Sequence, residues 1–142
     1  MTSLNRQEIA EINDSGHFNR WAGFSVRIAE AGKCVLEMPW REECGQYSGS
    51  LHAGVIAALL DTSCGFAAAS MLGAVTTSQI SICYLVPAIG KRFRAESNVV
   101  RGGRRQVFAE ARLIAENDDT EAIVATATAV LIRLPETSPP AP

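Results

Sequence analysis

Residues that bind metal ions or build disulfide frameworks are few in this sequence. Its 142 residues include two histidines, His17 and His52, and four cysteines without a C-x-x-C pair. This spacing does not match a zinc site, so we expect no metal and no cofactor. Three of the cysteines lie in or beside apolar runs, which is typical of reduced, buried thiols. Because the N-terminal residues also lack the basic and apolar segments of a signal peptide, the sequence predicts a cytoplasmic protein.

Charge of either sign is also sparse. Charged residues make up 20% of the chain and the net charge is −2, so the molecule has no strong overall field to attract nucleic acid or a membrane surface. We therefore expect neither as a partner. The one long apolar stretch, from Ala53 to Leu72, contains Asp61. Since an acid at the centre of a bilayer costs roughly 2.5–3.5 kcal/mol, this stretch is better explained as a buried helix than as a membrane span.

Hydrophobic periodicity predicts a single α+β domain over residues 1–134. The first expected elements are a short helix over 4–14, a hairpin of strands 24–28 and 34–38, and a long helix that Ser50 caps and Gly73 ends. Four strands with alternating apolar residues follow, over 80–86, 93–99, 107–115 and 123–131. The turns between them are too short for crossover helices, so we predict an antiparallel meander in a sheet wrapped around the long helix. The proline-rich tail, 135–142, is expected to be disordered.

Asp61 is the unusual residue, because it is a carboxylate midway along a helix that otherwise resembles core. Helical spacing places only small residues beside it: Gly54, Ala57, Ala58, Cys64, Gly65 and Ala68. The larger side chains of Val55, Ile56, Leu59 and Phe66 fall on the other side and are predicted to be core. Asp61 would then face a narrow groove, where it is a candidate general base or nucleophile. The alternative is an acid held by structural hydrogen bonds where two helices cross.

The start of the same helix is a second candidate. Its first backbone N–H groups have no partner inside the helix, and the helix dipole favours negative charge there, which suits an oxyanion. His52 and Asp61, however, are nine residues apart, on opposite faces and about 13.5 Å apart along the axis. If both ends serve one reaction, the helix start must come from one subunit and the carboxylate from another. The sequence therefore predicts an oligomer with shared sites.

Several motifs together resemble one family. They are Gly49-x-Leu51-His52-x-Gly54, Asp61 nine residues after the histidine, Thr76-Thr77 at the start of the next strand, Pro87-x-x-Gly90, and Arg101-Gly-Gly-Arg104-Arg105. This set resembles the hotdog-fold acyl-CoA thioesterases of the phenylacetate-pathway and 4-hydroxybenzoyl-CoA type, over roughly residues 46–134. The predicted sheet around a helix agrees with that fold.

The resemblance implies a role for each matching residue. Asp61 would attack the thioester or activate water, and Gln46 would orient that water. The Ala53 N–H, with that of Gly54, would polarise the thioester carbonyl, and His52 would hold the helix start in shape. Thr77 would act with Asp61 from the second subunit. The family usually has glycine at the position of Ala53, which keeps the backbone donor but would strain alanine if the position needed a positive φ.

Basic residues concentrate in one segment, where Lys91, Arg92, Arg94, Arg101, Arg104 and Arg105 supply six of the thirteen Lys and Arg. A turn at Gly102-Gly103 would bring Arg101 opposite Arg104, and guanidinium groups fork well onto phosphate oxygens. The cluster suits the phosphates of coenzyme A, as the resemblance also implies. Solvation of an ordinary strand pair is the alternative.

The sequence thus predicts hydrolysis of an acyl-CoA, with an aryl or a short to medium acyl group, by a homodimer or homotetramer. Coenzyme A enters as part of the substrate. A non-catalytic acyl-CoA sensor and a hydratase of the same fold are the alternatives. Neither His17 nor His52 fits the histidine that a hydratase requires.

Overall fold

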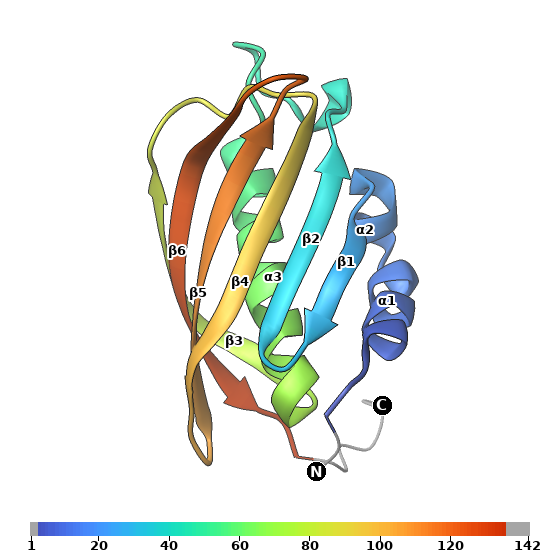
Figure 1. The fold of residues 1–142 in the computed structure, drawn as a ribbon, viewed down its shortest axis with the longest axis vertical. Helices are drawn as coiled ribbons and strands as arrows, with labels where there is room; N and C mark the ends of the chain where they lie inside the picture. Colours follow the sequence, from blue (N-terminus) through green and yellow to red (C-terminus); the bar gives the residue numbers. More distant parts are fainter. Residues whose placement is uncertain (1–2, 136–142) are drawn as a thin grey trace.

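The computed structural model describes residues 3–135 of the chain as one six-stranded sheet that curves around a central helix (Figure 1). The helices are α1 (Arg6–Ser15), α2 (His17–Ala22) and α3 (Ala53–Leu72), with a short 3-10 turn at Glu42–Cys44. The strands are β1 (Ser25–Glu30), β2 (Lys33–Pro39), β3 (Val75–Tyr84), β4 (Arg92–Gly102), β5 (Gln106–Glu116) and β6 (Glu121–Arg133). This confirms the predicted fold class. The predicted tail lies outside the described residues apart from Pro135.

The predicted N-terminal helix is confirmed as α1, but a second helix follows it. A capping box begins α1, because the Asn5 Oδ1 accepts from the Glu8 N–H at 3.0 Å and the Glu8 carboxylate accepts from the Asn5 N–H at 2.8 Å. Gly16 ends α1, and the chain resumes immediately as α2. Six residues are too few for a helical period to be recognised in the sequence, so α2 was not predicted.

The strand order corrects the predicted meander. All neighbouring strands are antiparallel, and β4, β5 and β6 do follow one another, but the order across the sheet is β1-β2-β4-β5-β6-β3. The segment 85–91 therefore crosses the end of the sheet instead of forming a tight turn. It bonds to the strands it passes, with the Leu85 N–H donating to the Val124 carbonyl and the Lys91 N–H to the Glu116 carbonyl. Those bonds allow a short connection to skip two strands.

The helix α3 fills the concave side of the sheet. Its buried residues include Val55, Ile56 and Leu59, as predicted. Within residues 3–135 it is the one helix long and apolar enough to cross a membrane, and 61% of its most apolar 18 residues are buried in the fold. Its apolar composition therefore reflects its place in the core. The N-cap is His52 and not Ser50, whose hydroxyl instead accepts from Gln46.

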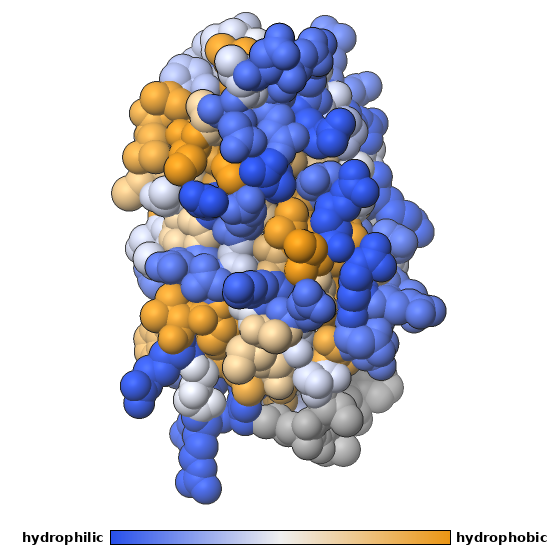
Figure 2. All heavy atoms as spheres, viewed as in Figure 1, coloured by the Kyte–Doolittle hydropathy of each residue, from blue (hydrophilic) through white to orange (hydrophobic). Residues whose placement is uncertain are grey.

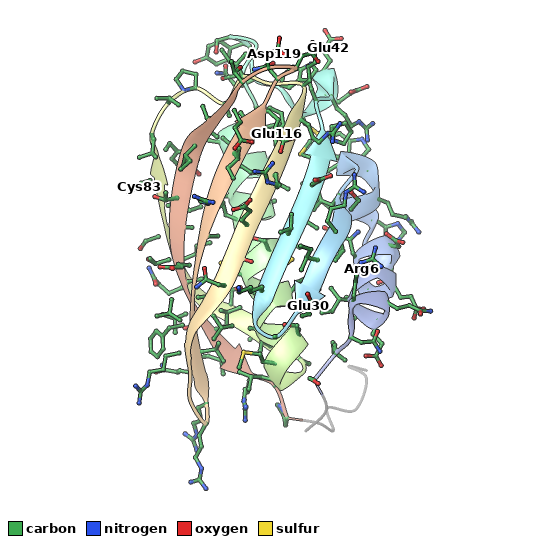
Figure 3. All side chains as sticks on the ribbon, viewed as in Figure 1. Arg6, Glu30, Glu42, Cys83, Glu116 and Asp119 are labelled. Carbon is green, nitrogen blue, oxygen red and sulfur yellow. The ribbon has the colours of Figure 1, made fainter. Side chains whose placement is uncertain are left out.

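Two kinds of surface cover the convex side of the sheet (Figure 2). Hydrophilic residues cover most of the face toward the viewer, with smaller hydrophobic patches near its middle, and hydrophobic residues also gather along the side where β3 forms the edge. Tyr84, Leu85 and Val86 are each about half exposed there. β3 pairs only with β6, so one of its backbone edges has no strand neighbour in the described chain. Figure 3 places the exposed Cys83 on this same edge strand.

Candidate active site

Asp61 lies in a hydrogen-bonded pair with Thr77. The Thr77 hydroxyl donates to the Asp61 Oδ1 at 2.6 Å, which is within the range of a charge-assisted O–H···O⁻ bond. α3 contributes the acid, and the first residues of β3 contribute the threonine. Both side chains are half-buried, so the pair can be reached from solvent. The two residues that the family resemblance assigns to one subunit therefore meet within this chain.

A cavity of about 470 Å³ opens beside this pair, within the usual size range of small-molecule sites. Apolar and small residues line most of it: Leu4, Ile9, Ile12, Gly65, Phe66, Ala69, Ala74, Val75 and Leu131. Its polar lining consists of Asn19, Asp61, Thr62, Thr76 and Thr77.

The face of α3 beside Asp61 differs in part from the predicted one. Cys64 and Ala68 are fully buried, whereas Phe66 is half-buried, so that it packs against the core, as predicted, and also lines the cavity. The groove of small residues is confirmed at Gly65, with Ala57 and Ala58 half-buried on the helix.

At the start of α3 only one of the two predicted oxyanion donors is available. The His52 Nδ1 accepts from the Gly54 N–H at 2.8 Å, so that donor is already used. The His52 N–H in turn donates to the Cys44 carbonyl at 2.9 Å. The Ala53 N–H has no acceptor within residues 3–135, and Ala53 is exposed. Its φ is not positive, so alanine is not strained at this position.

Gln46 is tied into its own loop. Its side-chain amide donates to the Ser48 and Ser50 hydroxyls, and its Oε1 accepts from the Ser48 N–H at 2.8 Å. The Gln46 backbone N–H also bonds to the Ser50 carbonyl, at 2.9 Å. These contacts fix the loop before α3 and leave Gln46 half-buried at its base.

The predicted site residues thus form two separate groups in one chain. Asp61 and Thr77 lie at the cavity, whereas Gln46, His52 and Ala53 lie at the N-terminal end of α3. Eight residues separate Ala53 from Asp61, which is about 12 Å along the helix axis. One substrate carbonyl cannot contact both groups of the same chain.

A family model described as Thioesterase superfamily matches residues 48–122, which contain both Ala53 and Asp61. The chain belongs to the thioesterase superfamily. A curated relative from Halobacterium salinarum, named "Putative esterase", is 32% identical over 119 residues, 78% of each chain.

Two solved structures of the thioesterase fold extend the comparison. A thioesterase family protein from Silicibacter pomeroyi is 32% identical and superimposes with a TM-score of 0.85, over 89% of this chain and 95% of that one. A protein of the phenylacetic acid degradation operon of E. coli is 18% identical with a TM-score of 0.83, over 91% and 92%. That second likeness concerns the fold alone. Superfamily membership identifies a hotdog-fold hydrolase and supports thioester hydrolysis in general as its chemistry.

Cys64 lies on α3 about one helical turn after Asp61. Burial, and then the nearby charge of Asp61, raise the pKa of Cys64 to about 12. The group is therefore a neutral thiol at physiological pH and not a nucleophile, which is consistent with the reduced, buried thiols that the sequence predicts.

The predicted basic cluster is divided by the fold. Arg101, Arg104 and Arg105 are exposed around the β4–β5 hairpin, where the Gly103 N–H donates to the Gln106 carbonyl at 2.8 Å. Lys91 precedes the other end of β4, about 30 Å away, and is paired with Asp118 at 2.5 Å. It does not join the hairpin arginines within this chain.

Arg133, which no pattern in the sequence indicates, joins that hairpin instead. Its backbone N–H donates to the Arg105 carbonyl at 2.9 Å, and its Nε is buried without an acceptor in the described chain. An isolated arginine near the end of the last strand gives no signal in the sequence, because only strand pairing brings it to the hairpin.

Proposed function

We propose that this protein hydrolyses an acyl-CoA thioester to the free acid and coenzyme A. The observation that carries the proposal is the Thr77–Asp61 hydrogen bond at the mouth of a largely apolar cavity, in a chain of the thioesterase superfamily. The cavity suits an acyl group, and the acid suits the reacting carbonyl.

In this mechanism Thr77 holds one oxygen of the Asp61 carboxylate, which leaves the other free for chemistry. That oxygen takes a proton from water as the water oxygen bonds to the thioester carbon, or attacks the carbon itself to give an anhydride that water then hydrolyses. In both routes the carbon–sulfur bond breaks, and the leaving thiolate acquires a proton. The Ala53 N–H stabilises the negative charge on the carbonyl oxygen, and the Gln46 Oε1, which accepts one bond from the Ser48 N–H and can accept a second, orients the water.

The site requires two subunits, because Ala53 and Asp61 of one chain are too far apart to share a carbonyl. We propose a homodimer in which each chain supplies Asp61 and Thr77 to one site and the start of α3 to the other, with a tetramer formed from two such dimers. The unpaired edge of β3 and its exposed apolar side chains support an interface there, since an uncovered edge strand is prone to aggregation.

Coenzyme A is the only cofactor-like group in this proposal, and it belongs to the substrate. The exposed arginines of the β4–β5 hairpin suit its phosphates, and Gly103 keeps that turn tight. The free, buried thiols of Cys34, Cys44 and Cys64 support a reducing, cytoplasmic location. The two histidines do not support a hydratase, because the His17 Nδ1 contacts Arg20 at 2.9 Å and the His52 Nδ1 caps α3.

The test is thiol release from a series of acyl-CoA esters by the wild type and by Asp61→Asn. We expect the variant to fold and to lose about 10²-fold or more in kcat, the usual scale for loss of a catalytic base. Asp119→Asn makes the same chemical change on an exposed loop and should retain wild-type turnover. Full activity in Asp61→Asn would remove Asp61 from the mechanism. A wild type that binds the esters without releasing thiol would be an acyl-CoA sensor.

A further inference from the structure

The cavity beside Asp61 has two chemically different sides. On one side it is lined by Ala74, Val75 and Thr77, at the start of β3. Val75 pairs with Arg133 across the sheet, and the Arg133 N–H bonds to the Arg105 carbonyl. This side therefore leads to the basic hairpin.

The other side is formed by the N-terminal helices. Leu4, Ile9 and Ile12 contribute aliphatic side chains to the lining, and Asn19 of α2 contributes an amide. The Asn19 Nδ2 donates to the Oδ1 of the buried Asn13 at 3.1 Å, so one of its two N–H donors is used inside the protein. In Figure 1, α1 and α2 lie along one flank of α3, whereas the β4–β5 hairpin projects from the lower end of the opposite flank.

The wall formed by α1 is held in place. The Leu4 N–H donates to the Ala69 carbonyl of α3 at 3.0 Å, and Ile9 is fully buried. Arg6, labelled in Figure 3, donates through its Nε to the Arg27 carbonyl of β1 at 3.0 Å. A side chain that changes on α1 therefore changes the size of the cavity without moving the helix.

This wall lies outside the segment that matches the superfamily model. The match begins at residue 48, whereas α1 ends at Ser15 and α2 at Ala22. The reacting groups Ala53, Asp61 and Thr77 lie inside it. The shared segment thus carries the chemistry, and the far wall of the cavity is contributed by the part of the chain that precedes it.

We infer that α1 determines acyl specificity, with Ile12 as the residue that limits the length of the acyl group, and that the substrate carries an apolar acyl group of medium length. The inference rests on the proposed function. With coenzyme A directed toward the hairpin arginines, the acyl group extends from Asp61 toward α1. A cavity of about 470 Å³ holds roughly fifteen water-sized groups, so an acetyl group leaves most of it unfilled and an octanoyl group fits.

Ile12 is the best position for a test because it lines the cavity and is 49% exposed. Substitution there does not disturb the buried core. The variants are Ile12→Ala, which enlarges the cavity, and Ile12→Phe, which shortens it. Glu11→Ala is the matched control, since Glu11 is the preceding residue on α1, is exposed and does not line the cavity.

The measured quantity is the ratio of kcat/KM for dodecanoyl-CoA to that for octanoyl-CoA, with acetyl-CoA as the short reference. One methylene more or less in an apolar pocket changes kcat/KM by about 10- to 200-fold. The lower value applies here because the Ile12 side chain is half exposed. We expect Ile12→Ala to raise the ratio about 10-fold, Ile12→Phe to lower it similarly, and Glu11→Ala to leave it unchanged. The changes should appear in KM more than in kcat.

The outcomes separate this inference from the proposed function. If the wild type releases no thiol from any of the esters, the proposed function fails. If it hydrolyses them but both Ile12 variants keep the wild-type ratio, α1 does not determine specificity. If the wild type prefers acetyl-CoA to octanoyl-CoA, the inferred acyl class is wrong.

Discussion

Replacing Ala53 with proline removes the hydrogen of a backbone N–H from the proposed site and puts the ring Cδ in its place. Ala53 is the first residue of α3, a position where proline is favoured because the N–H there has no partner in the helix. The preceding residue, His52, has φ −61° and ψ 135°, which is the conformation that a following proline requires. We therefore expect Ala53→Pro to keep the helix and the fold.

The expected loss of activity follows from how few donors the helix start offers. Because the Gly54 N–H is bound to the His52 Nδ1, no second amide of the helix start compensates for the loss of the first. Removing one oxyanion donor costs about 2.7–4 kcal/mol, or 10²–10³ in kcat. Steady-state thiol release measures this effect, and a urea unfolding curve checks the fold. Ala53→Gly, which keeps the N–H, is the control. A folded Ala53→Pro protein with the kcat of the control would refute the oxyanion role of this amide.

The same variant tests whether sites are shared between subunits. A dimer of one Ala53→Pro chain and one Asp61→Asn chain has one intact site, formed by Asp61 of the first chain and Ala53 of the second. Random reassociation of equal amounts should restore about a quarter of wild-type activity from two inactive proteins. If each site were complete within one chain, every site in the mixture would carry one defect and no activity would return.

Two further predictions concern single hydrogen-bonded groups. Thr77→Val removes the donor to Asp61, and the loss of about 1.5–3 kcal/mol for a bond to a charged group should lower kcat about 10- to 100-fold, while Thr77→Ser retains most activity; equal kcat in Val and Ser variants would argue against the role of this bond. Burial acts to raise the pKa of Glu96, but hydrogen bonds from Arg112 and Arg94 outweigh it and leave that pKa below its ordinary value of 4.5. Glu96 therefore stabilises the fold above pH 4.5, and this stability is lost as the pH falls through the lower folded pKa. The urea midpoint of unfolding should therefore decrease less between pH 7 and pH 3 in Glu96→Gln than in the wild type. An equal decrease in both proteins would contradict this prediction.

The fold class could be predicted because each local pattern agrees with it. The apolar helix from Ala53 to Leu72 and the alternating strands after it left few ways to bury both. The position of β3 could not be predicted, since the length of the segment 85–91 permits either a turn or a crossing. Its bonds to Val124 and Glu116 determine the outcome, and those depend on strands that follow later in the sequence.

The candidate site was predicted to different degrees for different residues. Asp61 could be singled out because an acid in an apolar helix violates a local rule, which often marks function. The capping role of His52 and the resulting loss of the Gly54 donor depend on a side-chain rotamer that spacing does not determine. The cavity wall of α1 was not predicted, because Ile12 is 49 residues before Asp61 and only tertiary packing joins them.

A single physical arrangement on α3 accounts for both the fold and the site. The sheet covers the side of the helix that carries Leu59, Leu60 and Cys64, all fully buried. On the opposite side, near Asp61, the helix residues that line the cavity include Gly65 and Ala69, which are too small to fill the space between α1 and β3. Had this side carried leucines, the space would be filled with core and the carboxylate would be enclosed without water, at a cost of several kcal/mol. The small residues keep the cavity open, so Asp61 remains in contact with solvent and with the substrate that we propose enters there.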